Sequence, residues 1–117
     1  MKDPTKQIAD LQSFVNLYYR SKRQDGEELS MLLQKITGIL FFLETVRSEV
    51  HDLYESKVFE LVKEGNSVAR AVNEANVIYP QMYQLRHIMS SGYKIADAIR
   101  TNISYLKSEK QSVNSKI

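Results

Sequence analysis

Hydrophobic residues recur at steps of three and four along almost the whole chain, which is the spacing of one face of an α-helix. At the start of the first such stretch, Asp3 can cap a helix and Pro4 suits its first position. The segment Arg23-Gln24-Asp25-Gly26 is a turn signal that ends it. The pattern predicts a first helix over residues 3–22, whose apolar face consists of Ile8, Leu11, Val15, Tyr18 and Tyr19.

A second and longer helix is predicted over residues 27–63. Glu27 and Glu28 favour the positive N-terminal end of this helix. Its apolar positions alternate three and four apart, which is the seam of coiled-coil packing, and Gly38 is the one weak point within it. The seam consists of Leu29, Leu32, Ile36, Ile39, Leu43, Val46, Val50 and Leu53.

Two further helices are predicted after a glycine stop. Gly65 ends the second helix and Ser67 caps a third over residues 67–79. Pro80 lacks a backbone N–H and crowds the preceding turn, so we expect a kink or a short break there. A fourth helix over residues 80–110 and a frayed tail over 111–117 follow. The apolar stripe of the fourth helix, interrupted at Gly92, consists of Leu85, Ile88, Ile95, Ile99, Ile103 and Leu106.

These elements predict one all-α domain over residues 1–117, a long antiparallel helical hairpin with a short N-terminal helix. Residues 27–63 as one helix would rise about 55 Å, far more than the width of a compact domain of this size. Phe41, Phe42 and Phe59 lie off or at the margin of the seam, so the apolar surface is wider than a two-helix hairpin needs. We therefore expect a helical homo-oligomer with the seam as its interface. The alternative is a break at Gly38 and a compact four-helix bundle.

The composition narrows the class of protein. The chain has 117 residues, 43% of them hydrophobic, and no cysteine, so a disulfide framework is excluded and the cytoplasm is the expected compartment. We expect no membrane-spanning segment, because no apolar run approaches the length of about 20 residues that a bilayer requires. The net charge of +2 is divided unevenly: residues 27–65 sum to −4 and residues 66–117 to +4. This asymmetry suits an anionic partner, charge-matched contact between copies, or internal pairing within a hairpin.

Residues typical of catalysis or of cofactor binding are sparse. The two histidines, His51 and His87, stand in no metal-ligand spacing, and the four glycines are too dispersed for a phosphate-binding loop. Arg47 and His51 are one helical turn apart, which is closer than ribonuclease-like pairs of this kind. We therefore predict a protein that is not an enzyme and carries no cofactor or metal.

One constellation favours binding of nucleic acid. Tyr79, Arg86, Tyr93 and Arg100 recur at seven-residue intervals, on the face expected to lie opposite the apolar stripe, and Lys94 flanks them beside Tyr83 and Lys107. Rings can stack on bases while the cations neutralise phosphates. The nucleic-acid-binding residues predicted are therefore Tyr79, Arg86, Tyr93, Lys94 and Arg100. The same pattern also occurs as half-buried tyrosines on a solvated helix face.

The stretch from Leu11-Gln12 through Asn16-Leu17-Tyr18-Tyr19-Arg20-Ser21-Lys22, and the segment His51-Asp52-Leu53-Tyr54, resemble the phage recombination mediator family UvsY. The resemblance implies a small helical protein that assembles into rings and binds single-stranded DNA. It also implies partners, a RecA-like recombinase and a single-strand binding protein, in the cytoplasm of a bacterial host. The basic pair of the family falls here on Ser48 and Val50, so its DNA contacts are not carried over.

Two functions are consistent with these observations. The first is a phage-type, oligomeric accessory protein of recombination that binds single-stranded DNA. The second is a non-enzymatic helical module that binds proteins, such as an assembly chaperone, a virion component or an inhibitor.

Overall fold

The described residues form four helices and no strand, as the hydrophobic spacing predicts. The computed structural model describes the backbone of residues 3–20 and 25–115, and side chains as far as residue 110. The helices are α1 (Thr5–Arg20), α2 (Gly26–Lys63), α3 (Val68–Ile78) and α4 (Gln81–Ser115). The predicted end of the first helix at Lys22 and the first half of the turn signal, Arg23 and Gln24, lie outside the described residues. The all-α fold class is confirmed.

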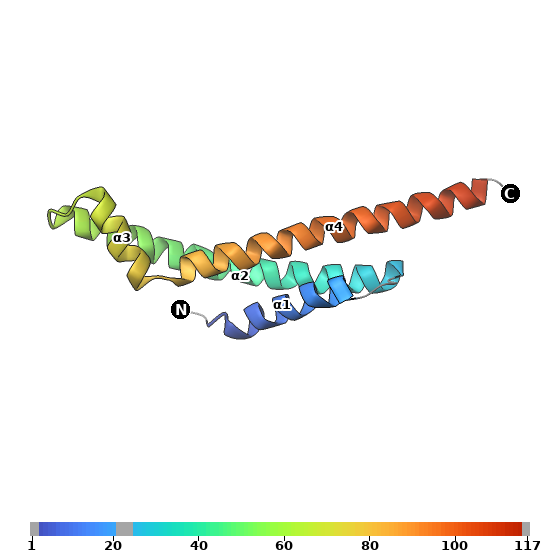
Figure 1. Cartoon of the computed structure of the whole chain (residues 1–117), viewed down its shortest axis with the longest axis horizontal. Helices are drawn as coiled ribbons and strands as arrows, with labels where there is room; N and C mark the ends of the chain where they lie inside the picture. The colour runs from blue at the N-terminus through green and yellow to red at the C-terminus, as the bar shows by residue number, and fades with distance from the viewer. Residues whose placement is uncertain (1–2, 21–24, 116–117) are drawn as a thin grey trace.

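The two long helices, α2 and α4, lie side by side and antiparallel (Figure 1). Helix α1 packs against both of them near their middle, and α3 packs on the C-terminal part of α2. The molecule is accordingly elongated, 75 × 25 × 20 Å. The hairpin with a short N-terminal helix is therefore the observed arrangement, with α3 as a cap at one end.

Local capping signals place the helix ends. The Asp25 side chain accepts a hydrogen bond from the Glu28 backbone N–H at 2.8 Å and caps α2. At the other end, Gly65 adopts φ 104°, and the N–H of Asn66 bonds to the carbonyl of Leu61 at 3.1 Å. This is a glycine-terminated helix end, which turns the chain directly into the Ser67 cap of α3.

Pro80 breaks the helix, as expected, because α3 ends at Ile78 and α4 begins at Gln81. Gly38 does not break α2, which continues through it, so the compact four-helix bundle is not the fold. The expectation of a frayed tail from residue 111 was also wrong over 111–115, since α4 extends to Ser115. That segment contains neither glycine nor proline, so nothing in it stops the helix.

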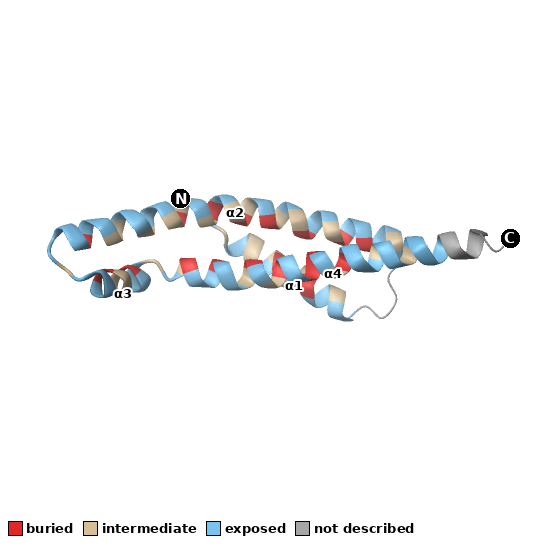
Figure 2. Cartoon of the chain, turned by 90° about the horizontal axis from the view of Figure 1, so that it is seen from above, coloured by how far each residue is buried: buried red, intermediate tan, exposed pale blue. Residues whose placement is uncertain are grey.

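The predicted oligomer seam is the core of the single chain. Leu29, Leu32, Ile36, Leu43, Val46 and Val50 are buried against α1 and α4, so they expose almost no surface to a second chain. Leu40 is buried in place of Ile39, which is only half-buried, and Leu53 is 43% exposed. The prediction failed because α4 and α1 together cover a wider strip of α2 than one partner helix would. Figure 2 shows the buried positions on the facing sides of the helices.

Helix α2 also corrects the expectation about membrane-spanning segments. By length and composition it is apolar enough to cross a bilayer. The buried core residues and the exposed phenylalanines lie close together in its sequence, and both raise the mean hydropathy of the same 18-residue stretch. A core helix of a water-soluble helical protein meets the same criterion, and one such helix is weak evidence for a membrane.

Candidate nucleic-acid interface

A row of exposed tyrosines and cations runs along the outer side of α4. Tyr83, Lys94 and Tyr105 follow one another at eleven-residue steps, which correspond to about three turns of a straight helix. All three are exposed, Tyr83 to 79% and Tyr105 to 67%. At 1.5 Å per residue the two rings are about 33 Å apart, with the lysine midway. We call Tyr83, Arg86, Lys94, Arg100 and Tyr105 the α4 outer face.

The seven-residue set predicted from the sequence lies at the edge of this face. Arg86, Tyr93 and Arg100 are all on α4 and exposed, but Tyr93 is exposed to only 44%. Positions seven apart drift by about 20° per step on a straight α-helix, so the row winds towards the core instead of staying opposite it. Tyr83, which was predicted only as a flanking residue, is therefore better exposed than Tyr93.

Tyr79 does not belong to the α4 outer face. It lies at the C-terminal cap of α3, before the break at Pro80, so the helical spacing does not carry it onto the α4 surface. Its side chain is half-buried and packs against the hydrophobic core. The structure therefore does not bring Tyr79 together with the exposed tyrosines and cations of α4.

The cations of the outer face are mostly available to a ligand. No described carboxylate lies within ion-pairing distance of Arg86 or Lys94. Arg100 donates to Asp97 at 2.9 Å, one turn earlier on the same exposed surface. Such exposed pairs contribute little, roughly 0 to 1 kcal/mol, so a phosphate could replace Asp97 at small cost.

One end of the outer face opens into a cavity of about 360 Å³ between α2, α3 and α4. Tyr83 and Arg86 belong both to the face and to the cavity wall. The other walls consist of aromatic and polar side chains of α2 and α3. The lining residues are His51, Tyr54, Glu55, Asn76, Met82, Tyr83 and Arg86. The cavity therefore extends the face with groups that can contact a base edge or a phosphate.

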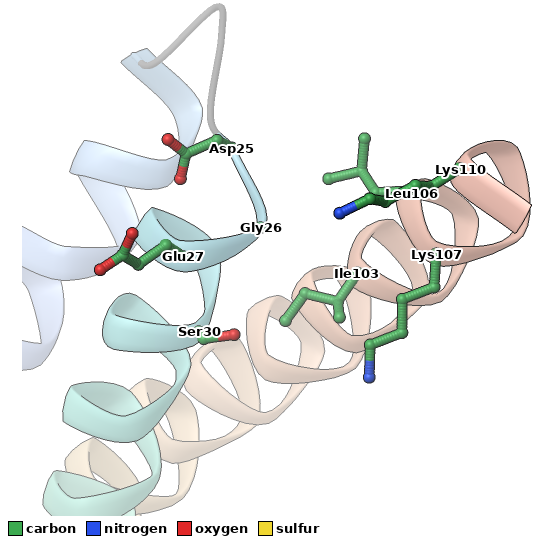
Figure 3. Close-up of a pocket in the computed structure, with 8 residues that line it drawn as sticks. All are labelled: Asp25, Gly26, Glu27, Ser30, Ile103, Leu106, Lys107 and Lys110. Carbon is green, nitrogen blue, oxygen red and sulfur yellow. The ribbon is translucent and has the colours of Figure 1, made fainter. Parts of the chain in front are cut away.

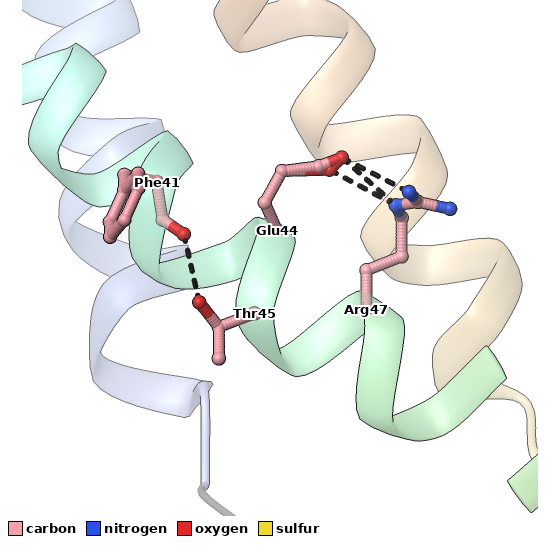
Figure 4. Close-up of polar contacts among 4 residues, drawn as sticks. All are labelled: Phe41, Glu44, Thr45 and Arg47. Atoms are coloured by element: carbon pink, nitrogen blue, oxygen red, sulfur yellow. Dashed lines mark hydrogen bonds and ion pairs between the residues drawn. The ribbon is translucent and has the colours of Figure 1, made fainter. Parts of the chain in front are cut away.

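The histidines support neither a metal site nor an acid–base pair. His51 lies 3.5 Å from the Glu55 carboxylate one turn away, and His87 is exposed. Arg47 is engaged by Glu44, with its Nε 3.2 Å from both carboxylate oxygens, so its guanidinium is held by Glu44 (Figure 4). Among the described residues no group of His, Asp and Glu is arranged to hold a metal ion.

Helix α2 exposes two phenylalanine rings. Phe41 is 78% exposed and Phe59 lies further along the same helix, also exposed. The Thr45 hydroxyl donates to the Phe41 carbonyl at 3.3 Å, so its polar group is satisfied within the helix (Figure 4). Between the two rings the same side of α2 exposes Thr45, Ser48, Asp52 and Ser56, so the phenylalanines are two separate apolar contacts.

Sequence reasoning missed Tyr105 and the cavity. The eleven-residue spacing of Tyr83, Lys94 and Tyr105 was a readable signal, whereas the meeting of His51, Asn76 and Arg86 depends on tertiary packing. Comparison with protein-family models, with curated proteins and with solved structures gives no match for the chain.

Proposed function

We propose that the protein is a non-enzymatic accessory protein that binds single-stranded nucleic acid along the α4 outer face. The observation that carries this proposal is a row in which two well-exposed tyrosine rings, Tyr83 and Tyr105, flank three cations. Arg86 and Lys94 have no carboxylate partner among the described residues, and Arg100 has only the exposed Asp97. Tyr83, exposed to 79%, presents its flat face to the solvent, where an unpaired base can stack on it.

The chemistry of the face favours single strands over duplexes. In a duplex the bases stack on one another, so a tyrosine on a helix surface cannot reach their flat faces. An unpaired strand can place bases on Tyr83 and Tyr105, while Arg86, Lys94 and Arg100 neutralise the intervening phosphates. Such binding is tolerant of sequence and depends strongly on salt.

The resemblance to UvsY supports a more specific proposal, a role in recombination. In that case the strand-bound protein would load a RecA-like recombinase onto DNA covered by a single-strand binding protein. Recombinase loading on coated DNA, measured with and without the protein, tests this finer proposal separately from binding itself.

The binding proposal is tested with a fluorescent oligonucleotide titrated at several salt concentrations. Replacing Arg86, Lys94 and Arg100 together with Gln removes three phosphate contacts. The slope of log affinity against log salt should then flatten by about two units, at roughly 0.7 per contact. Tyr83→Ala and Tyr105→Ala should each weaken binding by about 1 to 3 kcal/mol and leave the slope unchanged.

A matched control removes the same charge elsewhere. Lys6, Lys63 and Arg70 are exposed and lie on α1, α2 and α3, so their replacement with Gln should leave the slope nearly unchanged. Equal losses in the two triple variants would show that net charge matters and the outer face does not. Absence of binding by the parent protein at low salt would rule out the proposal.

The exposed phenylalanines of α2 support a second candidate function, that of a protein-binding helical module. Phe41 is the clearest anchor, since its ring is 78% exposed and buries little surface within one chain. Phe41→Ser combined with Phe59→Ser should abolish capture of such a partner while leaving oligonucleotide binding intact. Capture that persists in this double variant would rule out the second function.

A further inference from the structure

The cavity beside Tyr83 and Arg86 depends on the helix break at Pro80. Helix α3 ends at Ile78 and α4 begins at Gln81, so the two segments pack on α2 as separate helices. Asn76 before the break and Met82 after it consequently line the cavity from different helices, and α2 supplies the remaining wall. The cavity thus brings together side chains of three helices at one end of the α4 outer face.

The lining combines apolar surface with polar groups that have no partner within the chain. Met82 is buried, and Tyr54 packs against the hydrophobic core. The side chains of Asn76, Tyr83 and Arg86 make no hydrogen bond or ion pair with another described residue. A volume of about 360 Å³ is close to the lower limit for a small-molecule site, so the cavity suits one nucleobase and not several.

The charges of the lining favour a base over a phosphate inside the cavity. The Glu55 carboxylate lies 3.5 Å from His51 Nε2 and its side chain is 63% exposed, so it can accept a further hydrogen bond. This negative charge repels a phosphate, but it suits a neutral base that carries an amino group. Arg86 belongs to both the cavity wall and the outer face, so it can hold the phosphate of the same nucleotide outside the cavity.

The other end of α4 lacks this combination of groups. A cavity of about 660 Å³ lies there, between the start of α2 and the end of α4 (Figure 3). Its lining contains Lys107 and Lys110 but neither an aromatic ring nor a side-chain amide. The Glu27 carboxylate points away from it (Figure 3). This end can neutralise phosphates, whereas the end near α3 also offers an amide and a carboxylate to a base.

We propose that the cavity near α3 holds one unstacked base with an exocyclic amino group, from the strand bound along the α4 outer face. An amino group has two N–H donors, which the Asn76 carbonyl and the Glu55 carboxylate can both accept. The Asn76 amide can in turn donate to the ring nitrogen beside the amino group, as asparagine does with adenine. Thymine and uracil place a carbonyl oxygen where the amino group would be, so Glu55 disfavours them. The base site rests on the proposed function and adds one selective position to binding that is otherwise tolerant of sequence.

Fluorescence anisotropy with labelled oligonucleotides tests the cavity separately from the outer face. The reference strand is an oligothymidine of about 12 nucleotides, within the site sizes of single-strand-binding surfaces. Three further strands carry adenine, cytosine or guanine at one central position. The whole protein should bind each of them at least about fivefold more tightly than the reference strand. A strand with unsubstituted purine there keeps the ring of adenine without its amino group and should lose most of this preference.

Two variants and a matched control assign the preference to the cavity. Asn76→Ala and Glu55→Ala should each reduce the preference to less than about twofold, because each removes an acceptor for the amino group. Asn73→Ala should retain the full preference, since Asn73 is exposed on the same helix but does not line the cavity. All three residues are on the surface, so the fold should be kept, which circular dichroism verifies.

Failure of the base site and failure of the outer face give different results. Equal affinity of the parent for all the strands would overturn the base site and leave the outer face as a binding surface. A preference that survives Asn76→Ala and Glu55→Ala would overturn it as well. Equal binding of the adenine and purine strands would attribute the preference to stacking and also overturn it. Absence of binding to every strand at low salt would overturn both proposals.

Discussion

The close packing of α1 and α2 against α4 depends on Gly92. A Cβ built on this residue would lie 3.0 Å from Leu40 Cδ2 and 3.1 Å from Leu11 Cδ2, closer than ordinary van der Waals contact. Gly38 provides the matched comparison, since it also lies within a long helix but has no described atom within 4 Å of an added Cβ. The substitutions Gly38→Ala and Gly92→Ala therefore differ only in what the new methyl group meets.

Both substitutions gain the intrinsic preference of alanine over glycine within a helix, about 1 kcal/mol. At Gly38 this gain should appear in full. At Gly92 it is opposed by overpacking, which costs about 1 to 3 kcal/mol, so the free energy of unfolding should fall by up to about 2 kcal/mol or remain level. The two variants should thus differ by about 1 to 3 kcal/mol.

Urea unfolding followed by circular dichroism at equal protein concentrations measures this difference. In thermal unfolding it corresponds to roughly 4 °C for each kcal/mol in a chain of this length. Leu11→Ala removes a side chain that the added methyl group meets, so its cost should be smaller in the Gly92→Ala background than in the parent. The difference should be at least about 0.5 kcal/mol in a double-mutant cycle. If Gly92→Ala stabilises the protein as much as Gly38→Ala does, α1 does not pack against α4 at this position.

Four further outcomes are expected. Gly65→Ala should lower the free energy of unfolding by about 1 kcal/mol, since φ 104° is strained for alanine, and Asp25→Ala should lower it by about as much through loss of the cap, both measured by urea unfolding. Leu43→Asp places an unpaired charge in the core and should cost several kcal/mol, seen as loss of the cooperative transition. The Thr5 hydroxyl and N–H donate to the Asp3 carboxylate and hold its pKa below the ordinary value. The ionised carboxylate therefore stabilises the start of α1 at any pH above the ordinary pKa. This contribution is lost as the pH falls through the lowered pKa. In an NMR titration Thr5→Ala should raise the Asp3 midpoint, and an unchanged midpoint would show that the hydroxyl bond does not form in solution.

The sequence by itself determined the helices and most of their ends. Hydrophobic steps of three and four, the glycine at 65, the cap at Ser67 and the proline at 80 act over one or two turns, so they can be read without knowing the rest of the fold. The cations at 86, 94 and 100 could also be placed on the surface, because charged side chains are rarely buried without a partner. These signals are local, and the structure agrees with them.

Only the tertiary structure decided which side of each helix is covered. A heptad seam was expected to join separate chains, but α1 and α4 bury it within one chain and select Leu40 over Ile39. Tyr79 was assigned to a surface that the break at Pro80 removes. The cavity that brings together His51, Asn76 and Arg86 likewise depends on how α2, α3 and α4 pack. The physical reason is that helical periodicity fixes the angle between residues of one helix, whereas burial depends on how many neighbours pack around it and on the small rotation that accumulates along its length.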